Sequence, residues 1–107
     1  MRKLSVASQF SEFPAGRVPE DGPNSGERFR EEFLVPLLEG SRDAIEINLD
    51  DTLGYGSSFL DEAFAGLLRN NRKTEKELKE RFIFVDSREI YQSMIWDYIS
   101  EEQARAH

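Results

Sequence analysis

Apolar and polar positions alternate in two segments of the chain, near residues 3–9 and 44–49. Alternation with a period of two residues is typical of β-strands. A third segment, residues 82–85, is apolar throughout, which indicates a strand buried on both faces. The pair Arg17-Val18 is a candidate for a further short strand. The pattern therefore predicts three strands and leaves open a fourth.

Longer segments repeat their apolar residues every three or four positions, which indicates amphipathic helices. The first is expected to begin at Asn24 or Ser25, because Asn24 and Glu27 have the spacing of a capping box, and to bend or end early at Pro36. The second is expected to begin after a glycine-rich loop. Two further helices are predicted, one over residues 74–81 and a last one that follows a cap at Asp86 or Ser87.

The order of these elements predicts an α/β fold. Strands separated by helices imply parallel crossover connections, so we expect a mixed, mostly parallel sheet of about four strands. The length of 107 residues fits a single domain, 1–107, with an ordered core over about residues 3–100 and a polar, fraying tail at 101–107.

Two loops carry the candidate binding residues. Loops that follow parallel strands leave the sheet at the same edge, which is where open α/β sheets place ligands or partners. The predicted face combines loops 16–30 and 50–62, and its candidate partner- or anion-binding residues are Arg17, Asp21, Gly22, Ser25, Gly26, Arg30, Gly56, Asp61 and Glu62. Plain turn and capping roles remain open at this stage: Ser57 and Ser58 suit a helix cap, and Arg17 suits an ion pair with Asp21 or Glu27.

Charge and composition narrow the classes of partner. The formal net charge is −7, which disfavours phosphate backbones and anionic lipid, so neither nucleic acid nor membrane is expected as a partner. No cysteine is present, so disulfides, thiolate nucleophiles and cysteine-based zinc sites are excluded. No apolar run reaches the length of about 20 residues that a membrane span needs, and we expect a cytoplasmic protein.

Catalytic signatures are weak. The one histidine is His107, at the end of the chain, which disfavours a Ser-His-Asp triad. The glycine-rich phosphate-binding fingerprints are missing from the sequence. The remaining candidate for an enzymatic or Mg²⁺/Ca²⁺ site is the acidic group of Asp50, Asp51, Asp61 and Glu62, and we rank it last. We predict no enzyme activity, no catalytic residues, no cofactor and no metal.

A family resemblance is carried by the segment from Ile45 to Leu67. The strand Ile45-Glu46-Ile47-Asn48-Leu49-Asp50-Asp51 and the helix start Gly56-Ser57-Ser58-Phe59-Leu60-Asp61-Glu62-Ala63-Phe64 resemble the STAS-like family of uncharacterised bacterial proteins. The upstream motif Asp21-Gly22-Pro23-x-Ser25-Gly26-Glu27-x-Phe29-Arg30 is also similar to that family. The resemblance implies helices packed mainly on one face of the sheet.

The wider STAS class resembles anti-sigma factor antagonists, and this likeness implies a function. In those domains a histidine-kinase-type (GHKL) ATPase phosphorylates a serine at the start of the helix after the central strand. The equivalent position here is Ser58 or, second, Ser57. The STAS pattern Asp-Ser-Ser-Gly is replaced by Gly56-Ser57-Ser58-Phe59, so the acid and the glycine that flank the serines are missing. Arg17 and Arg30 are the basic residues expected to face a phosphate.

Two functions from different classes follow. The first is a non-enzymatic regulatory module, a candidate phosphoprotein in signalling, that docks to a GHKL-type ATPase through loops 16–30 and 50–62. The second is a small-anion or nucleotide-binding domain that uses the N-termini of the first two helices.

Overall fold

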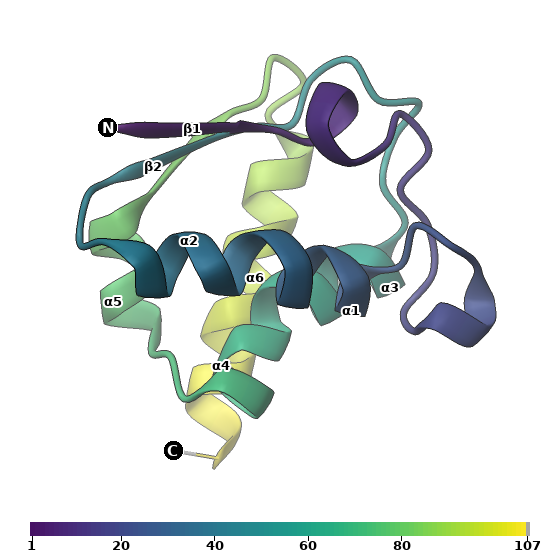
Figure 1. Ribbon diagram of the computed structural model, residues 1–107. Helices are drawn as coiled ribbons and strands as arrows, with labels where there is room; N and C mark the ends of the chain where they lie inside the picture. Colours follow the sequence, from purple (N-terminus) through teal and green to yellow (C-terminus); the bar gives the residue numbers. More distant parts are fainter. Residues whose placement is uncertain (107) are drawn as a thin grey trace.

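A three-stranded sheet forms one side of the molecule and the helices form the other. The computed structural model describes residues 1–106, and His107 of the predicted tail lies outside them. The sheet has the order β1-β2-β3, and both pairs are parallel. Its strands are β1 (Arg2–Ser5), β2 (Ile45–Asn48) and β3 (Phe82–Val85). Figure 1 shows the sheet above α1, α2, α3 and α4.

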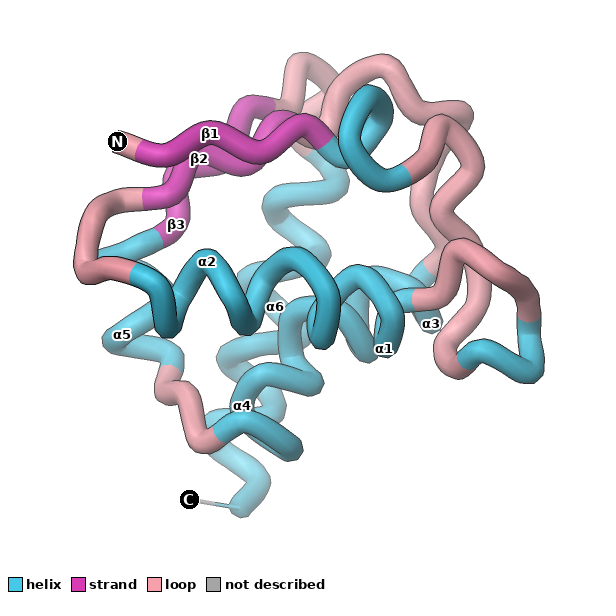
Figure 2. The backbone as a smooth tube through the Cα atoms, in the orientation of Figure 1, coloured by secondary structure: helices cyan, strands magenta, loops and turns pink. Residues whose placement is uncertain are grey.

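Two long helical rods cross beneath the sheet, and each contains a π-helical segment. The first rod consists of α1 (Gly26–Phe29), a π segment (Arg30–Leu34) and α2 (Val35–Gly40). The second consists of α3 (Ser57–Leu60), a π segment (Asp61–Ala65) and α4 (Gly66–Asn71). The residues at the junctions keep right-handed helical backbone angles, so each rod is continuous (Figure 2). The chain then forms α5 (Glu75–Arg81) and the long α6 (Ile90–Ala106).

The predicted α/β class is confirmed, but the sheet is smaller and simpler than expected. It has three parallel strands among the described residues, not about four in a mixed arrangement. Arg17 and Val18 do not form a strand, because both of their backbone amides donate to the carboxylate of Asp21. These two hydrogen bonds fold the segment into a turn that leads to the 3₁₀ helix Pro19–Asp21.

The first strand is shorter than predicted. It ends at Ser5, and residues Val6–Phe10 form a single π-helical turn. Local hydrogen bonds explain the change of conformation: the Ser5 hydroxyl accepts from Ser8 N, and Gln9 Oε1 accepts from Ser5 N. Such side-chain bonds offer the backbone an alternative to a strand ladder. The alternation of Leu4 and Val6 reflects burial of both residues, not a strand that reaches residue 9.

Helix starts and ends differ in detail from the prediction. Ser25 caps α1, accepting a hydrogen bond from Arg28 N, whereas Asn24 donates to the Phe13 carbonyl. Pro36 does not end its helix, which passes through the preceding π segment and continues to Gly40. Gly56 is the N-cap of α3, so neither Ser57 nor Ser58 caps it. The polar tail is helical as far as Ala106, and Glu102 within it is buried.

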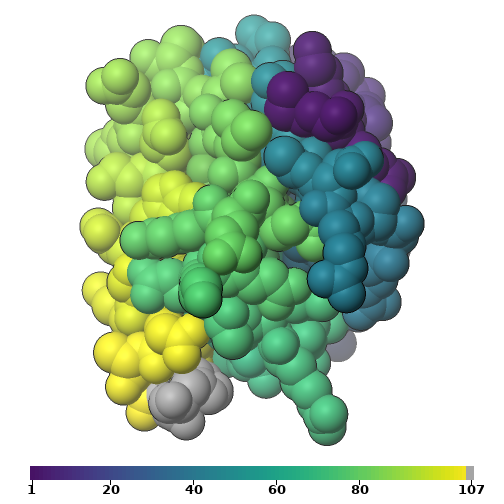
Figure 3. Space-filling model, turned by 90° about the vertical axis from the view of Figure 1, so that its left-hand side faces the viewer, coloured from purple at the N-terminus to yellow at the C-terminus, as the bar shows by residue number. Residues whose placement is uncertain are grey.

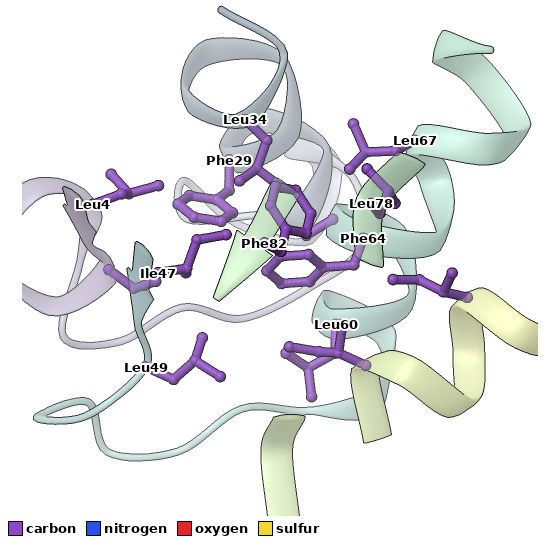
Figure 4. Packing of buried hydrophobic residues seen from close by; sticks show 14 of the residues in the cluster. Leu4, Phe29, Leu34, Ile47, Leu49, Leu60, Phe64, Leu67, Leu78 and Phe82 are labelled. Carbon is purple, nitrogen blue, oxygen red and sulfur yellow. The ribbon is translucent and has the colours of Figure 1, made fainter. Parts of the chain in front are cut away.

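The helices cover one face of the sheet, as the family resemblance implied. Alternate strand residues such as Leu4 and Ile47 are buried against the helices, and the core includes Phe29, Leu60 and Phe64 from the two rods (Figure 4). The other face is open. Ile83 is 47% exposed, so the prediction that residues 82–85 are buried on both faces is wrong.

Arg81, the last residue of α5, attaches this helix to the connection between α2 and β2. Arg81 donates to the carbonyls of Ser41 at 2.8 Å and Asp43 at 2.9 Å, in the connection between α2 and β2. Figure 3 views the end of the molecule near α5, where this helix in green lies between α6 in yellow and the blue chain that precedes β2. The loops that follow β1 and β2 lie at the opposite end (Figure 1).

Candidate functional site

The loops after β1 and β2 lie side by side, as the β-α order of the sequence predicts. Leu53 N donates to the Glu12 carbonyl at 3.0 Å, which joins the two loops through their backbones. Arg17 Nη1 lies 2.7 Å from Asp61 Oδ2, which joins the first loop to the helix that follows the second. We call the exposed surface of residues 11–25 and 50–58 the loop face (Figure 2).

Asp21 shapes the first loop from within. Its Oδ2 accepts hydrogen bonds from Arg17 N at 3.0 Å and Val18 N at 3.2 Å. These backbone amides hold the pKa of the Asp21 carboxyl below its usual range. Gly16 has a φ of +90°, and a Cβ there would lie 2.7 Å from Asp21 Cβ, so the turn requires glycine at this position.

Four of the predicted site residues are buried at the junction of the two rods. Ser25 and Gly26 begin the first rod, and a Cβ on Gly26 would lie 2.6 Å from the carbonyl oxygen of Phe59. Arg30 is 4% exposed and Glu62 is 9% exposed. These four residues are therefore covered by the protein itself and are not part of its exposed surface.

Arg30 and Glu62 form a buried ion pair between the two π segments. Arg30 Nη1 lies 2.6 Å from Glu62 Oε2 and also donates to the Glu62 carbonyl at 2.7 Å. Arg30 Nε donates to Glu31 Oε2 at 3.1 Å. The guanidinium passes over Gly66, where a Cβ would overlap Arg30 Nη1. The absence of a side chain at Gly66 therefore makes room for the buried arginine.

Asp61 extends this pair into a network that reaches α6. Its Oδ2 accepts from Arg17 at 2.7 Å and from Arg69 at 3.0 Å. Partial burial alone would raise the pKa of the Asp61 carboxyl, but the hydrogen bonds from Arg17 and Arg69 outweigh it and lower the pKa. Arg69 also contacts Glu102 Oε1 at 2.7 Å, and Arg105 contacts the same oxygen at 2.9 Å. The network thus links the first loop to the last helix.

The exposed part of the loop face combines hydroxyl and apolar groups. Ser57 and Ser58 are exposed at the start of α3, where Gly56 supplies no side-chain cap. Phe13 is 60% exposed and Leu53 is 81% exposed, and they neighbour the hydrogen bond between the two loops. Sequence reasoning missed both apolar residues. The signal available was an apolar residue within a polar, turn-rich loop, next to Pro14 in one case and Gly54 in the other.

The second loop is held by residues that sequence reasoning also missed. Arg88 donates to the carbonyls of Leu49 at 2.9 Å and Thr52 at 3.3 Å. Asp50 Oδ1 accepts from both the backbone and the hydroxyl of Ser87. These contacts attach the loop after β2 to the turn after β3, so the second loop has a defined shape.

The predicted acidic group does not assemble into one cluster. Asp50 bonds to Ser87, whereas Asp61 and Glu62 bond to arginines. Over residues 1–106 no three acidic or histidine side chains are placed to hold a metal ion together. Asp51, the fourth member, adopts a φ of 71° in the loop.

Comparison with known proteins identifies the family. The family model described as a STAS-like domain of unknown function (DUF4325) matches residues 25–92. The chain therefore belongs to this STAS-like family, and the resemblance seen in the sequence is confirmed. No curated protein and no solved structure matches the chain. Within the described part of the chain, no helix is both long enough and apolar enough to cross a membrane.

Tyr55 supplies a pH-dependent test of how the second loop is built. Burial raises the pKa of its phenol to about 12, and the hydroxyl donates to the Leu49 carbonyl at 2.8 Å. The unfolded chain releases this proton near its ordinary pKa of about 10, so stability should fall as the pH rises from about 10 to 12. Urea unfolding across this range should show the loss in the wild type and a smaller loss in Tyr55→Phe. Equal losses in both proteins would contradict the assignment.

Proposed function

We propose that this chain is a non-catalytic regulatory module that docks onto a protein partner through the loop face. The observation that carries the proposal is the pair Phe13 and Leu53, two exposed apolar side chains on loops that are hydrogen-bonded to each other. Large exposed apolar groups inside a polar rim are typical of the anchors of protein interfaces. The loops beneath them are braced by Asp21, Arg17 and Arg88, so little conformational freedom would be lost on binding.

The proposed partner is a GHKL-type ATPase of the histidine-kinase kind. This assignment rests on the likeness of STAS-like domains to anti-sigma factor antagonists. The exposed hydroxyls of Ser57 and Ser58 suit a phosphorylation switch, because a phosphate would add a charge of about −1.5 to −2 at a helix N-terminus. Arg17 pairs with Asp61, which lies about one helical turn after Ser57 and Ser58. The side chain of Arg17 is 42% exposed. Arg30 is buried on Glu62, so Arg17 is the arginine available to a phosphate.

Binding of the purified partner tests the proposal. The partner is first isolated by affinity capture and identified, and its affinity is then measured by calorimetry. Phe13→Asp and Leu53→Asp should each weaken binding by roughly tenfold or more, as expected for interface anchors. Ile83→Asp, on the open face of the sheet, adds the same charge at an exposed apolar position and should leave the affinity within about twofold. Equal weakening by all three variants would refute the docking face.

The phosphorylation switch has a separate test. Incubation of the chain with the identified ATPase and ATP should add one phosphate, which peptide mass spectrometry should locate to Ser58 or Ser57. Ser57→Ala/Ser58→Ala is the matched control. No mass shift in the wild type would remove the switch and leave the docking role standing.

A second candidate function is binding of a small anion or nucleotide at the start of α3. The observation that favours it is the glycine N-cap, which leaves the first amides of the helix without a side-chain partner. A thermal-shift titration with ATP, GTP and inorganic phosphate distinguishes the two functions. A saturable rise in Tm would support the anion site, and no rise would leave protein docking as the function.

A further inference from the structure

The turn after β3 carries a third exposed apolar side chain at the same end of the sheet as the loop face. Ile90, the first residue of α6, is 59% exposed. The turn lies against the second loop, because Arg88 donates to the Thr52 carbonyl at 3.3 Å (Figure 1). Three loops that contact one another therefore each present one large apolar side chain, from Phe13, Leu53 and Ile90.

Exposed apolar side chains concentrate at this end of the molecule. Among the described residues five large apolar side chains are exposed, and three of them lie on the loops that follow the three strands. The other two are Met1, at the start of the chain, and Ile83, on the open face of the sheet. Single exposed apolar residues are ordinary on a protein surface, whereas a group of them on adjoining loops is typical of a contact site.

An exposed carboxylate flanks the apolar residue in each of the three loops. Glu12, Asp51 and Glu89 each lie one or two residues before the apolar side chain of their loop. None of these three carboxylates forms an ion pair within residues 1–106. They do not form a metal site either, since no three acidic side chains of the described part of the chain are placed to hold a metal ion. Their charges therefore border the apolar side chains without a counter-charge.

The three loops are strongly negative as a whole. Residues 11–25, 50–58 and 86–90 contain seven acidic residues and two arginines, a formal charge of −5 in a chain of −7. Both arginines are engaged within the chain, since Arg17 pairs with Asp61 and Arg88 donates to backbone carbonyls. An acidic partner surface would be repelled from these loops, and a basic one would be attracted.

We infer that the docking face includes the turn after β3, and that the partner presents an apolar surface bordered by lysine or arginine side chains. The inference rests on the proposed docking function, to which it adds a third contact segment and the charge of the partner. Apolar contacts at the centre of an interface supply most of the affinity. Opposite charges at its rim raise the association rate and exclude partners of the wrong charge.

A capped tetrapeptide with two leucines between two arginines is the probe for this chemistry. Titrated into ¹⁵N-labelled protein, it should shift the amide signals of residues 12–13, 51–54 and 88–91 in a saturable manner. The same peptide with glutamates in place of the arginines should bind about tenfold more weakly or less. Equal binding of the two peptides, or no saturable shift in the turn after β3, would overturn the inference.

Removal of the three flanking charges tests the basic rim of the partner. Glu12→Gln/Asp51→Asn/Glu89→Gln should weaken binding of the purified partner by about tenfold, since each exposed ion pair contributes roughly twofold. Added salt should weaken partner binding of the wild type more than that of this triple variant, because salt screens exposed charges.

The matched control removes three exposed charges at the end of the molecule near α5. Glu39→Gln/Asp43→Asn/Glu80→Gln changes the net charge by the same amount. Its affinity for the partner should stay within about twofold of the wild type, because the charges lie well beyond a Debye length from the loops. Equal weakening by the two triple variants would show a general effect of net charge and overturn the basic rim.

Ile90→Ser tests the third contact segment without a change of charge. Serine is accepted at the start of a helix, so α6 should remain folded. Partner affinity should fall by about tenfold, as expected for an anchor residue. Ile83→Ser is the matched control on the open sheet face and should stay within about twofold of the wild type. Unchanged affinity in Ile90→Ser would refute the third segment.

The variants of the first two loops separate this inference from the docking proposal. If Phe13→Asp and Leu53→Asp weaken partner binding, and Ile90→Ser and the flanking-charge variant do so too, both stand. If the first two variants weaken it while Ile90→Ser or the flanking-charge variant leaves it unchanged, the inference is refuted and the docking face stands. If neither Phe13→Asp nor Leu53→Asp has an effect, the docking face is refuted, and the inference with it.

Discussion

Glu62→Ala is expected to lower the free energy of unfolding by about 3–5 kcal/mol, because it removes the buried counter-charge of Arg30 and leaves its guanidinium only the exposed carboxylate of Glu31. Arg30 cannot move away without losing its bond to the Glu62 carbonyl, and it fills the space above Gly66. Urea unfolding monitored by the fluorescence of Trp96 measures the change.

The matched control replaces both partners. Arg30→Met/Glu62→Leu removes both charges and keeps apolar volume, so its stability should lie within about 1–2 kcal/mol of the wild type. A Glu62→Ala variant as stable as the wild type would show that Arg30 is not buried as described. A double variant as unstable as the single one would show that the pair is required for packing and not for charge balance.

Gly26→Ala is expected to lower the free energy of unfolding by about 1–3 kcal/mol, the usual range for overpacking. A Cβ at this position would lie 2.6 Å from the Phe59 carbonyl oxygen and 3.1 Å from Ala63 N. Both are backbone atoms, so the two rods must separate to admit the methyl group. Because these rods begin directly after the two loops of the proposed docking face, partner affinity should fall together with stability.

Gly40→Ala provides the comparison. The nearest atom to a Cβ at Gly40 is Arg2 Nη1, at 3.2 Å, which is the end of a flexible side chain. Thermal unfolding should give a Tm for this variant close to that of the wild type. A Gly26→Ala protein with the same Tm as the Gly40→Ala protein would contradict the close approach of the two rods.

The strands and helices that the sequence predicted correctly are those with a clear period. The alternation in residues 45–48 and the helical repeats after Ser25 and Ser57 correspond to β2 and the two rods. The early end of β1 at Ser5 depends on hydrogen bonds from Ser5 and Gln9 side chains, which do not alter the apolar pattern. The π segments were not predicted either. One extra residue in a helical turn changes the apolar period very little, so the sequence pattern does not reveal it.

The position of the candidate site could be predicted, but not which of its residues are exposed. The rule that parallel strands deliver their loops to one edge correctly brought the two loops together, but the guanidinium of Arg17 pairs with Asp61 and not with the expected Asp21 or Glu27. The burial of Arg30 and Glu62 depends on how closely the rods approach, which is set by Gly26 and Gly66 in three dimensions. Charged residues in a sequence are ordinarily assumed to be exposed, so this burial could not be read from the pattern.

The open face of the sheet was not predicted either. A continuous apolar run is typical of a strand covered on both sides, as in larger α/β folds. Here the face that carries Lys3, Glu46 and Ile83 has no helix over it among the described residues. On the covered face, Phe82 and Phe84 contact Phe64, and Phe84 also contacts Trp96.

Hydrogen–deuterium exchange of the chain, free and bound to its purified partner, tests the central claim most directly. That claim is that the loops after β1 and β2 act as one surface. Binding should slow amide exchange in residues 11–22 and 50–58 together, and it should leave the exchange of β3 and α5 unchanged. Slower exchange in only one of the two loops, or in the strands of the open sheet face, would contradict it.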